Sequence, residues 1–262
     1  IEDPDNVADL QDAADTYLEV KSPDELISEI KKNLYVTQVK QEHKNLYTQD
    51  WQRVYTTNYD EIPILSSKES EKPLYPVTLS DDVQIERENR KQCIYINGYI
   101  GKLNKNTLQS EFKLSGRSYS AEALNDSPWS AILEDDLLNV DCVVIVGLSL
   151  EYDLDLRRII YAKNVINKTV FIENDKISPD KQRKLRRYGV VYPIGVEAFT
   201  KDLEEYKAAH PVSQATPMIH IYKCFDVGRK KNVVKRATSL QVYDLFMTGQ
   251  IENRDNLWHT KN

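Results

Sequence analysis

The sequence predicts an α/β protein built around a parallel sheet, and two features of its pattern lead to this prediction. Between residues 141 and 206, apolar segments of strand length alternate with amphipathic segments of helix length, and this alternation is typical of βαβ units. Within residues 141–146, the run CVVIV is continuously apolar and ends at Gly147. Such a run is the pattern of a strand that is buried on both faces of a parallel sheet.

Composition places the chain among folded, soluble proteins. It has 262 residues, of which 40% are hydrophobic and 29% are charged, so it can bury a sizeable core. With 35 Lys and Arg against 41 Asp and Glu, its formal charge is −6, which argues against a general nucleic-acid binder. The sequence has neither an apolar run near the roughly 20 residues that span a bilayer nor a signal-peptide pattern.

The cysteines indicate a reducing compartment. Three are present, at Cys93, Cys142 and Cys224, and their number and spacing fit neither a disulfide framework nor a CxxC zinc site. We therefore expect a cytoplasmic protein.

The N-terminal part is predicted to be helical. The sequence Ser22-Pro23-Asp24-Glu25 is a capping box with proline at the first helical position, so a helix is expected to begin there. Apolar residues at helical spacing predict the flanking helices. The three expected helices cover residues 7–18, 23–34 and 39–47.

The pattern then changes to strands. Residues 51–56 alternate and are rich in aromatic and β-branched side chains, which predicts a strand, with a turn at 57–60. Residues 61–90 contain three prolines and many charges, so we expect an excursion with one or two short edge strands. A second strand is expected at 93–97, ending at Gly98.

The remaining elements follow the βαβ pattern. Helices are expected at 128–138, 153–163, 179–187 and 197–206, and strands at 141–146, 168–172 and 189–194. Residues 210–217 look like a boundary. We therefore expect one domain over residues 1–211 and the start of a truncated C-terminal region or linker over 212–262.

Glycine is scarce, with only 8 in the chain and the first at Gly98. The N-terminal third therefore contains neither a GxGxxG nor a GxxxxGK motif. The chain starts at Ile1 rather than at a methionine. A glycine-rich nucleotide loop, and the N-terminal strand that leads to it, are accordingly expected upstream of this chain and missing from it.

Polar segments follow four of the predicted strands, at the edge where a parallel sheet binds ligands. They are residues 56–60, 97–101, 147–153 and 173–175. Each has ordinary loop composition by itself, but four at one edge of one sheet predict a binding site. Gly147 lets backbone approach a ligand, and Glu173 stands where an acidic side chain can hold a ribose diol.

The motifs at these positions resemble a known family. They are WQRVYTTNYDE at 51–61, INGYI at 96–100, VVIVGLSLEYDLDLRRII at 143–160 and VFIEND at 170–175. Together they extend the likeness over residues 7–207, and the combination resembles the sirtuin-like domains of bacterial anti-phage defence proteins. TTNYD is the most specific motif and is similar to the TQNID-type motif of sirtuins.

The resemblance implies a Rossmann-like, doubly wound parallel sheet with a helical insertion. It also implies an enzyme that hydrolyses NAD+ to nicotinamide and ADP-ribose in abortive infection, with NAD+ as its substrate. In this reading Asn58 is the catalytic asparagine and Asp60 supports it. The residues implied to contact NAD+ are Thr56, Thr57, Asn97, Gly147, Ser149, Asp153, Glu173 and Asn174.

These residue types suit cleavage of the bond between nicotinamide and ribose. Nicotinamide leaves as a neutral molecule, so no strong acid is needed, and the transition state is oxocarbenium-like, as in glycoside hydrolysis. An amide such as that of Asn58 can position water or the leaving carboxamide. A histidine would complete the site as a general base.

The expected histidine is missing. In the family it lies two residues before the NG pair or next to its glycine, and Tyr95 and Asn97 hold those positions. The four histidines, at 43, 210, 220 and 259, all lie elsewhere. Because a tyrosine with a pKa of about 10 is a poor base near neutral pH, we hypothesise an inactive NAD+ hydrolase in which Tyr95 replaces the base.

A second reading is a non-catalytic sensor of NAD+ or ADP-ribose that regulates a neighbouring domain. A deacylase is disfavoured because three scattered cysteines cannot form the four-cysteine zinc module of deacylating sirtuins, so no zinc is expected. The expected partners are NAD+, further copies of the chain or a partner domain of a defence complex, and a phage trigger. No membrane is expected.

Overall fold

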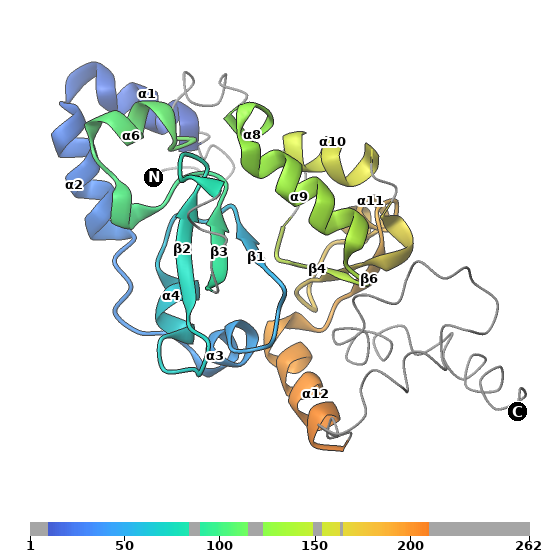
Figure 1. The fold of residues 1–262 in the computed structure, drawn as a ribbon. Helices are drawn as coiled ribbons and strands as arrows, with labels where there is room; N and C mark the ends of the chain where they lie inside the picture. The colour runs from blue at the N-terminus through green and yellow to red at the C-terminus, as the bar shows by residue number, and fades with distance from the viewer. Residues whose placement is uncertain (1–9, 84–89, 115–122, 149–153, 163–164, 210–262) are drawn as a thin grey trace, which may run out of the picture. The chain divides into compact units, whose positions relative to one another are not determined.

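The computed structural model describes residues 10–83, 90–114, 123–148, 154–162 and 165–209 (Figure 1). The chain divides into two compact units, Ile1–Leu133 and Glu134–Asn262, and this division falls inside the predicted domain 1–211. The predicted region 212–262 lies outside the described residues. None of the described helices is both long enough and apolar enough to cross a bilayer.

The first unit begins with the three expected helices, α1 (Leu10–Val20), α2 (Pro23–Asn33) and α3 (Gln41–Tyr47). The predicted capping box is confirmed at α2. The Glu25 backbone N–H donates to Ser22 Oγ at 3.3 Å, and the Ser22 backbone N–H donates to Glu25 Oε2 at 2.9 Å. Leu26 is the buried residue of α2, and it packs in a cluster with Leu103, Leu108, Phe112 and Leu114.

A three-stranded parallel sheet forms the centre of this unit. Its strands are β1 (Val54–Thr56), β2 (Leu74–Thr78) and β3 (Lys91–Tyr95), in the order β1-β3-β2. Thr56 and Thr78 are both in register with Tyr95, so all three strands reach their carboxyl ends at the same edge. The segments that follow the three strands therefore begin at the same edge of the sheet.

The first strand is shorter than predicted, and the side chain of Trp51 is bonded to the end of α3. The Trp51 indole N–H donates to the Leu46 carbonyl at 2.7 Å. This bond fixes the start of the predicted strand 51–56 to the preceding helix, and only Val54–Thr56 pair in the sheet. The second predicted strand, 93–97, begins and ends two residues earlier.

The segment 61–90 contains a helix that the sequence reading did not include, α4 (Ile62–Ser67), and the expected edge strand, β2. Pro63 lies in the first turn of α4, where its missing N–H costs no hydrogen bond. Pro76 lies within β2, which is the outer strand of the sheet and so tolerates a proline.

Side chains alternate between the two faces of β3. On one face Ile94 packs with Val77 and with Trp129 from α9 (Pro128–Asn139), the helix predicted at 128–138. On the other face Cys93 and Tyr95 pack in a cluster with Leu74, Tyr99 and Ile100. The unit also contains η1 (Ile100–Lys102), α6 (Lys105–Ser110) and α8 (Ala123–Asp126).

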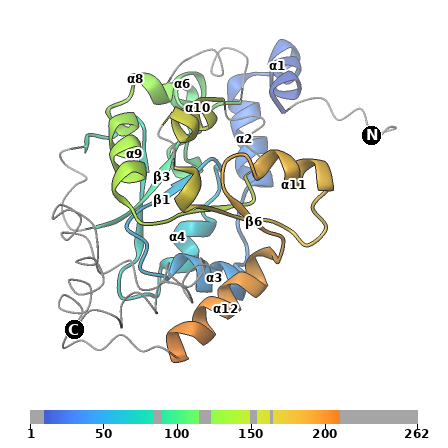
Figure 2. The ribbon, with the colours of Figure 1, turned by 90° about the vertical axis from the view of Figure 1, so that its right-hand side faces the viewer.

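The second unit contains another parallel sheet, with strand order β4-β5-β6. Its strands are β4 (Val143–Val146), β5 (Thr169–Ile172) and β6 (Val190–Tyr192). The carboxyl ends of all three are again in register. The accompanying helices are α10 (Leu154–Ala162), η2 (Ile166–Lys168), α11 (Pro179–Leu185) and α12 (Gly195–Ala209) (Figure 2). Helix α11 contacts β6, and α12 contacts β5.

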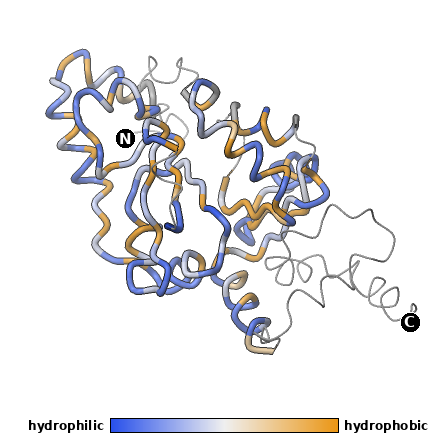
Figure 3. The backbone as a smooth tube through the Cα atoms, viewed as in Figure 1, coloured by the Kyte–Doolittle hydropathy of each residue, from blue (hydrophilic) through white to orange (hydrophobic). Residues whose placement is uncertain are grey.

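The prediction that residues 141–146 form a strand buried on both faces is wrong. β4 is an outer strand of its sheet, and Val146 is 37% exposed. The central strand β5 is the one whose residues are all buried. The residues of β4 (VVIV) and β5 (TVFI) are mostly hydrophobic, whereas α12 alternates between hydrophobic and hydrophilic residues (Figure 3). Hydropathy therefore identifies these strands without revealing which of them is central.

The architecture is α/β with parallel strands, as predicted, and is compatible with a Rossmann-like fold. The described strands pair as two three-stranded sheets rather than one. The four polar segments expected at one sheet edge accordingly form two pairs. Residues 56–60 and 97–101 belong to the first unit, and residues 147–153 and 173–175 belong to the second.

Candidate functional site

The loop after β1, residues 56–60, is held by the end of β3 and the residues that follow it. The Thr56 carbonyl accepts a hydrogen bond from the Ile96 backbone N–H at 2.9 Å. The Thr57 carbonyl accepts one from the side-chain Nδ2 of Asn97 at 3.2 Å. These two bonds continue the pairing of β1 with β3 beyond the strands themselves.

The second half of the loop is held in the same way. The Tyr59 carbonyl accepts from the Ile100 backbone N–H at 2.9 Å, and the Asp60 carbonyl accepts from the Tyr95 hydroxyl at 2.8 Å. Among the described residues, Asn58 is therefore the one member of the loop whose carbonyl has no such bond. We call residues 56–60 the clamped loop.

In the clamped loop the side chain of Tyr59 is packed and hydrogen-bonded, whereas the side chain of Asn58 is exposed to solvent. Tyr59 stacks on Phe112 with 5.4 Å between ring centroids, and its hydroxyl donates to the Lys113 carbonyl at 2.8 Å. The Asn58 backbone N–H donates to Thr56 Oγ1 at 3.1 Å, but the Asn58 side chain is exposed. The fold thus presents the amide of Asn58 to solvent on a loop that is fixed on both sides.

Asn97 is the most informative residue at this edge. It is only 5% exposed, and its Oδ1 is buried without a hydrogen-bond partner among the described residues. The Thr57 carbonyl can only accept a hydrogen bond, so the amide nitrogen of Asn97 must face it and Oδ1 must be the free atom. A buried acceptor without a partner costs roughly 1–3 kcal/mol, and a ligand O–H or N–H would remove that cost.

Gly98 allows the chain to turn directly after Asn97. Its φ is +104°, and a Cβ at this position would lie 2.8 Å from the Phe112 ring. Only glycine adopts this conformation without strain and leaves room for the ring. Gly98 is therefore required for the shape of this edge.

Tyr95, predicted to stand in the place of the base, is fully buried. Its ring contacts that of Tyr99 with 4.6 Å between centroids, and its hydroxyl donates to Asp60. Burial raises the pKa of Tyr95 far above its ordinary value, so the hydroxyl stays protonated. In this position Tyr95 can act as a hydrogen-bond donor to the loop but has no access to take a proton from a ligand.

Asp60, the expected support for Asn58, lies two residues before the start of α4. Its Oδ1 accepts a hydrogen bond from the Ile62 backbone N–H at 2.8 Å. The next residue is held as well, because the Tyr99 hydroxyl donates to Glu61 Oε1 at 3.0 Å. Asp60 therefore joins the clamped loop to the helix.

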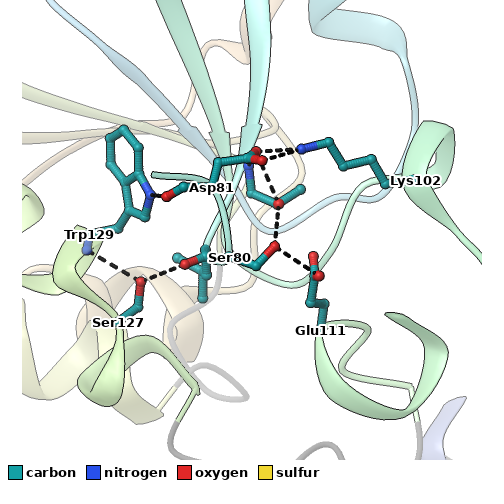
Figure 4. A network of polar contacts seen from close by, with 8 residues as sticks. Ser80, Asp81, Lys102, Glu111, Ser127 and Trp129 are labelled. Atoms are coloured by element: carbon teal, nitrogen blue, oxygen red, sulfur yellow. Dashed lines mark hydrogen bonds and ion pairs between the residues drawn. The ribbon is translucent and has the colours of Figure 1, made fainter. Parts of the chain in front are cut away.

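The segment after β2 carries polar residues that the sequence reading did not include (Figure 4). Asp81 Oδ2 accepts from the backbone N–H and the hydroxyl of Thr78, at 2.7 and 3.1 Å. The Asp81 carboxylate also pairs with Lys102, and its carbonyl accepts from the Trp129 indole N–H at 2.9 Å. The register of β2 with β3 places this segment at the same sheet edge as the clamped loop. The sequence alone does not show that register.

The same network reaches α6 through Ser80. Its hydroxyl donates to Glu111 Oε1 at 2.9 Å, while Glu111 Oε2 is buried without a partner among the described residues. Ser127 donates to the Leu79 carbonyl at 2.8 Å. The network fixes the segment after β2 at the same edge as the clamped loop.

In the second unit, Glu173 lies directly after β5 and is 5% exposed. Its Oε2 accepts from Lys181 Nζ at 2.9 Å, while Oε1 is buried without a partner among the described residues. Its backbone N–H donates to Tyr192, and its carbonyl accepts from Gly195. Glu173, the residue expected to bind a ribose, thus forms an ion pair with Lys181 of α11 through one carboxylate oxygen. Its other carboxylate oxygen has no hydrogen-bond partner among the described residues.

The other predicted residues of this unit are placed in part. Gly147 has φ +67°, and no atom of the described residues lies within 4 Å of where its Cβ would be. Asn174 is exposed, and its Oδ1 accepts from the Lys176 backbone N–H at 2.9 Å, which is a local turn contact. Ser149 and Asp153 lie outside the described residues.

The structure therefore brings the predicted site residues together in two sets. The first unit holds Thr56, Thr57, Asn58, Asp60, Tyr95 and Asn97, and the second holds Gly147, Glu173 and Asn174. In the described part of the chain, no group of three or more His, Cys, Asp or Glu residues could hold a metal ion. No protein-family model and no curated protein matches the sequence.

Proposed function

We propose that this chain is an NAD+-binding domain of the sirtuin-like type, derived from NAD+ hydrolases of anti-phage defence and silent in hydrolysis as its sequence stands. One observation carries the proposal. The clamped loop presents the exposed amide of Asn58, and its neighbour Thr57 is bonded to Asn97, whose buried Oδ1 has no partner among the described residues. An exposed amide beside an unfilled acceptor suits a ligand that carries both donors and acceptors.

The ends of NAD+ offer such groups. The carboxamide and the ribose hydroxyls both donate and accept hydrogen bonds, and Asn97 Oδ1 is suited to receive one of these donors. The amide of Asn58 is suited to position the carboxamide or a water molecule beside the ribose carbon. At this carbon the bond to nicotinamide breaks through an oxocarbenium-like transition state, which needs no acid for the neutral leaving group.

The second unit, taken by itself, offers Glu173 as a residue that suits a ribose diol. Its Oε1 has no partner among the described residues, and an acidic side chain after a parallel strand can accept hydrogen bonds from two adjacent hydroxyls. The ion pair with Lys181 keeps the carboxylate in place. A doubly wound sheet and a cytoplasmic location also belong to this proposal.

We propose that the domain does not hydrolyse NAD+ because no histidine that could act as the base is found beside Asn58 among the described residues. Tyr95 is buried and protonated, and the one histidine in the described residues, His43, lies in α3. This observation also favours the second candidate function. In that reading the domain senses NAD+ or ADP-ribose and regulates a neighbouring domain or partner without any turnover.

Calorimetric titration with NAD+ and an assay of nicotinamide release test the proposal together. We expect the wild type to bind NAD+ with little or no nicotinamide release. Asn58→Ala should weaken binding at least several-fold, whereas Asn106→Ala, which changes another exposed asparagine, on α6, should not. If the wild type does not bind NAD+ or ADP-ribose, the proposal is wrong, and rapid release of nicotinamide would refute silence in hydrolysis.

A further inference from the structure

Two tyrosine hydroxyls hold the junction between the clamped loop and α4. Tyr95 donates to the Asp60 carbonyl, and Tyr99 donates to the carboxylate of the next residue, Glu61. The two rings contact each other within one buried cluster. The junction is therefore fixed from the sheet side at two consecutive residues.

Asp60 is fixed from the helix side as well, through its Oδ1 and the Ile62 N–H. The residue thus bonds to β3 with its carbonyl and to α4 with its side chain. Asn58 lies two residues away, and its own carbonyl has no bond that holds it among the described residues. The position of the Asn58 amide consequently depends on how firmly the residues on both sides of it are held.

We propose that Tyr95 is a positioning residue for Asn58. Its buried hydroxyl fixes the carboxyl end of the clamped loop, so that the exposed amide is presented in one orientation. That this orientation matters for NAD+ rests on the function proposed above, whereas the hold on the loop does not. The role explains why a tyrosine stands here: phenylalanine would fill the same space but could not donate to Asp60.

Tyr95→Phe tests the idea because it removes only the hydroxyl. Tyr47→Phe is the matched control, since Tyr47 packs against the same buried cluster and its hydroxyl makes no hydrogen bond among the described residues. Amide hydrogen exchange would be followed at Asn58 and Ile62. We expect about 3- to 10-fold faster exchange there in Tyr95→Phe, with helices α11 and α12 unchanged and no local effect from Tyr47→Phe.

A double-mutant cycle with NAD+ separates positioning from general stability. Tyr95→Phe should weaken NAD+ binding about 3- to 10-fold in the wild-type background and have no further effect in the Asn58→Ala background, because it acts through Asn58. Unchanged exchange at the loop, equally faster exchange throughout the first unit, or an equal loss of affinity in both backgrounds would each overturn the inference.

The experiments distinguish a failure of the proposed NAD+ function from a failure of the positioning role of Tyr95. If the wild type does not bind NAD+, the NAD+ proposal fails, while the exchange experiment still decides whether Tyr95 holds the clamped loop. If the wild type binds and the loop loosens in Tyr95→Phe without any loss of affinity, the loop is held by Tyr95 but the positioning role is refuted.

Discussion

The side-chain Nδ2 of Asn97 lies 3.2 Å from the carbonyl oxygen of Thr57, and this contact joins the end of β3 to the clamped loop. It leaves Asn97 Oδ1 buried and free of partners among the described residues. Of the two positions where the resemblance predicted from the sequence would put a base, Asn97 is the one bonded to Thr57, the residue before Asn58. The other, Tyr95, is closed off in the core.

The first prediction is that Asn97→His introduces NAD+ hydrolysis and Tyr95→His does not. An imidazole at position 97 can donate its Nδ1–H to the Thr57 carbonyl, which leaves Nε2 as a neutral base. We expect nicotinamide release to rise about 10²- to 10⁴-fold above that of the wild type.

The pH profile checks the assignment of that activity. A general base works only when it is neutral, so the rate of Asn97→His should increase as the pH rises through the histidine pKa, about 6.5. Adding Asn58→Ala should remove the gain. Activity in Tyr95→His, with none in Asn97→His, would reverse our assignment of the two positions.

The second prediction concerns the Glu173–Lys181 ion pair. Lys181→Met leaves the buried carboxylate of Glu173 without its cation. Since Lys181 is 32% exposed, the loss of stability should fall below the range for fully buried pairs, at about 2 kcal/mol in urea unfolding.

Two further variants make this prediction specific. Glu173→Gln added to Lys181→Met should recover much of the lost stability, because no buried charge then remains. Lys184→Met on the same helix should cost under about 0.5 kcal/mol, since the Lys184–Asp180 pair is exposed on both sides. Equal losses for Lys181→Met and Lys184→Met would show that burial of Glu173 does not matter.

The third prediction is that Gly98→Ala is far more harmful than Gly147→Ala. Both glycines have positive φ, but a Cβ at Gly98 would meet the Phe112 ring, whereas a Cβ at Gly147 would meet no atom of the described part of the chain within 4 Å. We expect a loss of about 3 kcal/mol for Gly98→Ala and about 1 kcal/mol for Gly147→Ala. Chemical denaturation of the two variants measures both values, and similar losses would argue against the close approach of Phe112.

The fourth prediction is a pH dependence at the start of α2. Hydrogen bonds from the Ser22 backbone and hydroxyl lower the pKa of Glu25 below its ordinary value of 4.5. A lowered pKa means that the ionised form stabilises the folded state, so this contribution is present above pH 4.5 and is lost as the pH falls through the folded-state value.

Glu25→Gln tests this dependence, because glutamine keeps the shape of the capping box but not the charge. The variant should be less stable than the wild type at pH 7, and the difference should disappear as the pH falls from 4.5 through the lowered folded-state pKa of Glu25. A difference that stays constant over this range would show that the charge of Glu25 does not contribute.

The sequence by itself determined the local elements of this protein. Ser22 and Glu25 specify the start of α2 because a capping box is completed by residues three apart in the chain. Helical spacing and apolar runs likewise located α9, β4 and β5 to within a few residues. The polar residues after β1 and β3 were also recognised as candidates, because loops that follow parallel strands carry ligands.

Only the tertiary structure decided how these elements combine. It made β5 rather than the more apolar β4 the central strand, and it placed β3 between β1 and β2. In the tertiary structure Tyr95 is buried in the core, and the side chain of Asn97 donates a hydrogen bond to the Thr57 carbonyl. These outcomes depend on pairing between strands far apart in the chain, and hydropathy is the same whichever neighbour a strand takes. The roles of Tyr95 and Asn97 are therefore set by strand order and register rather than by the local sequence.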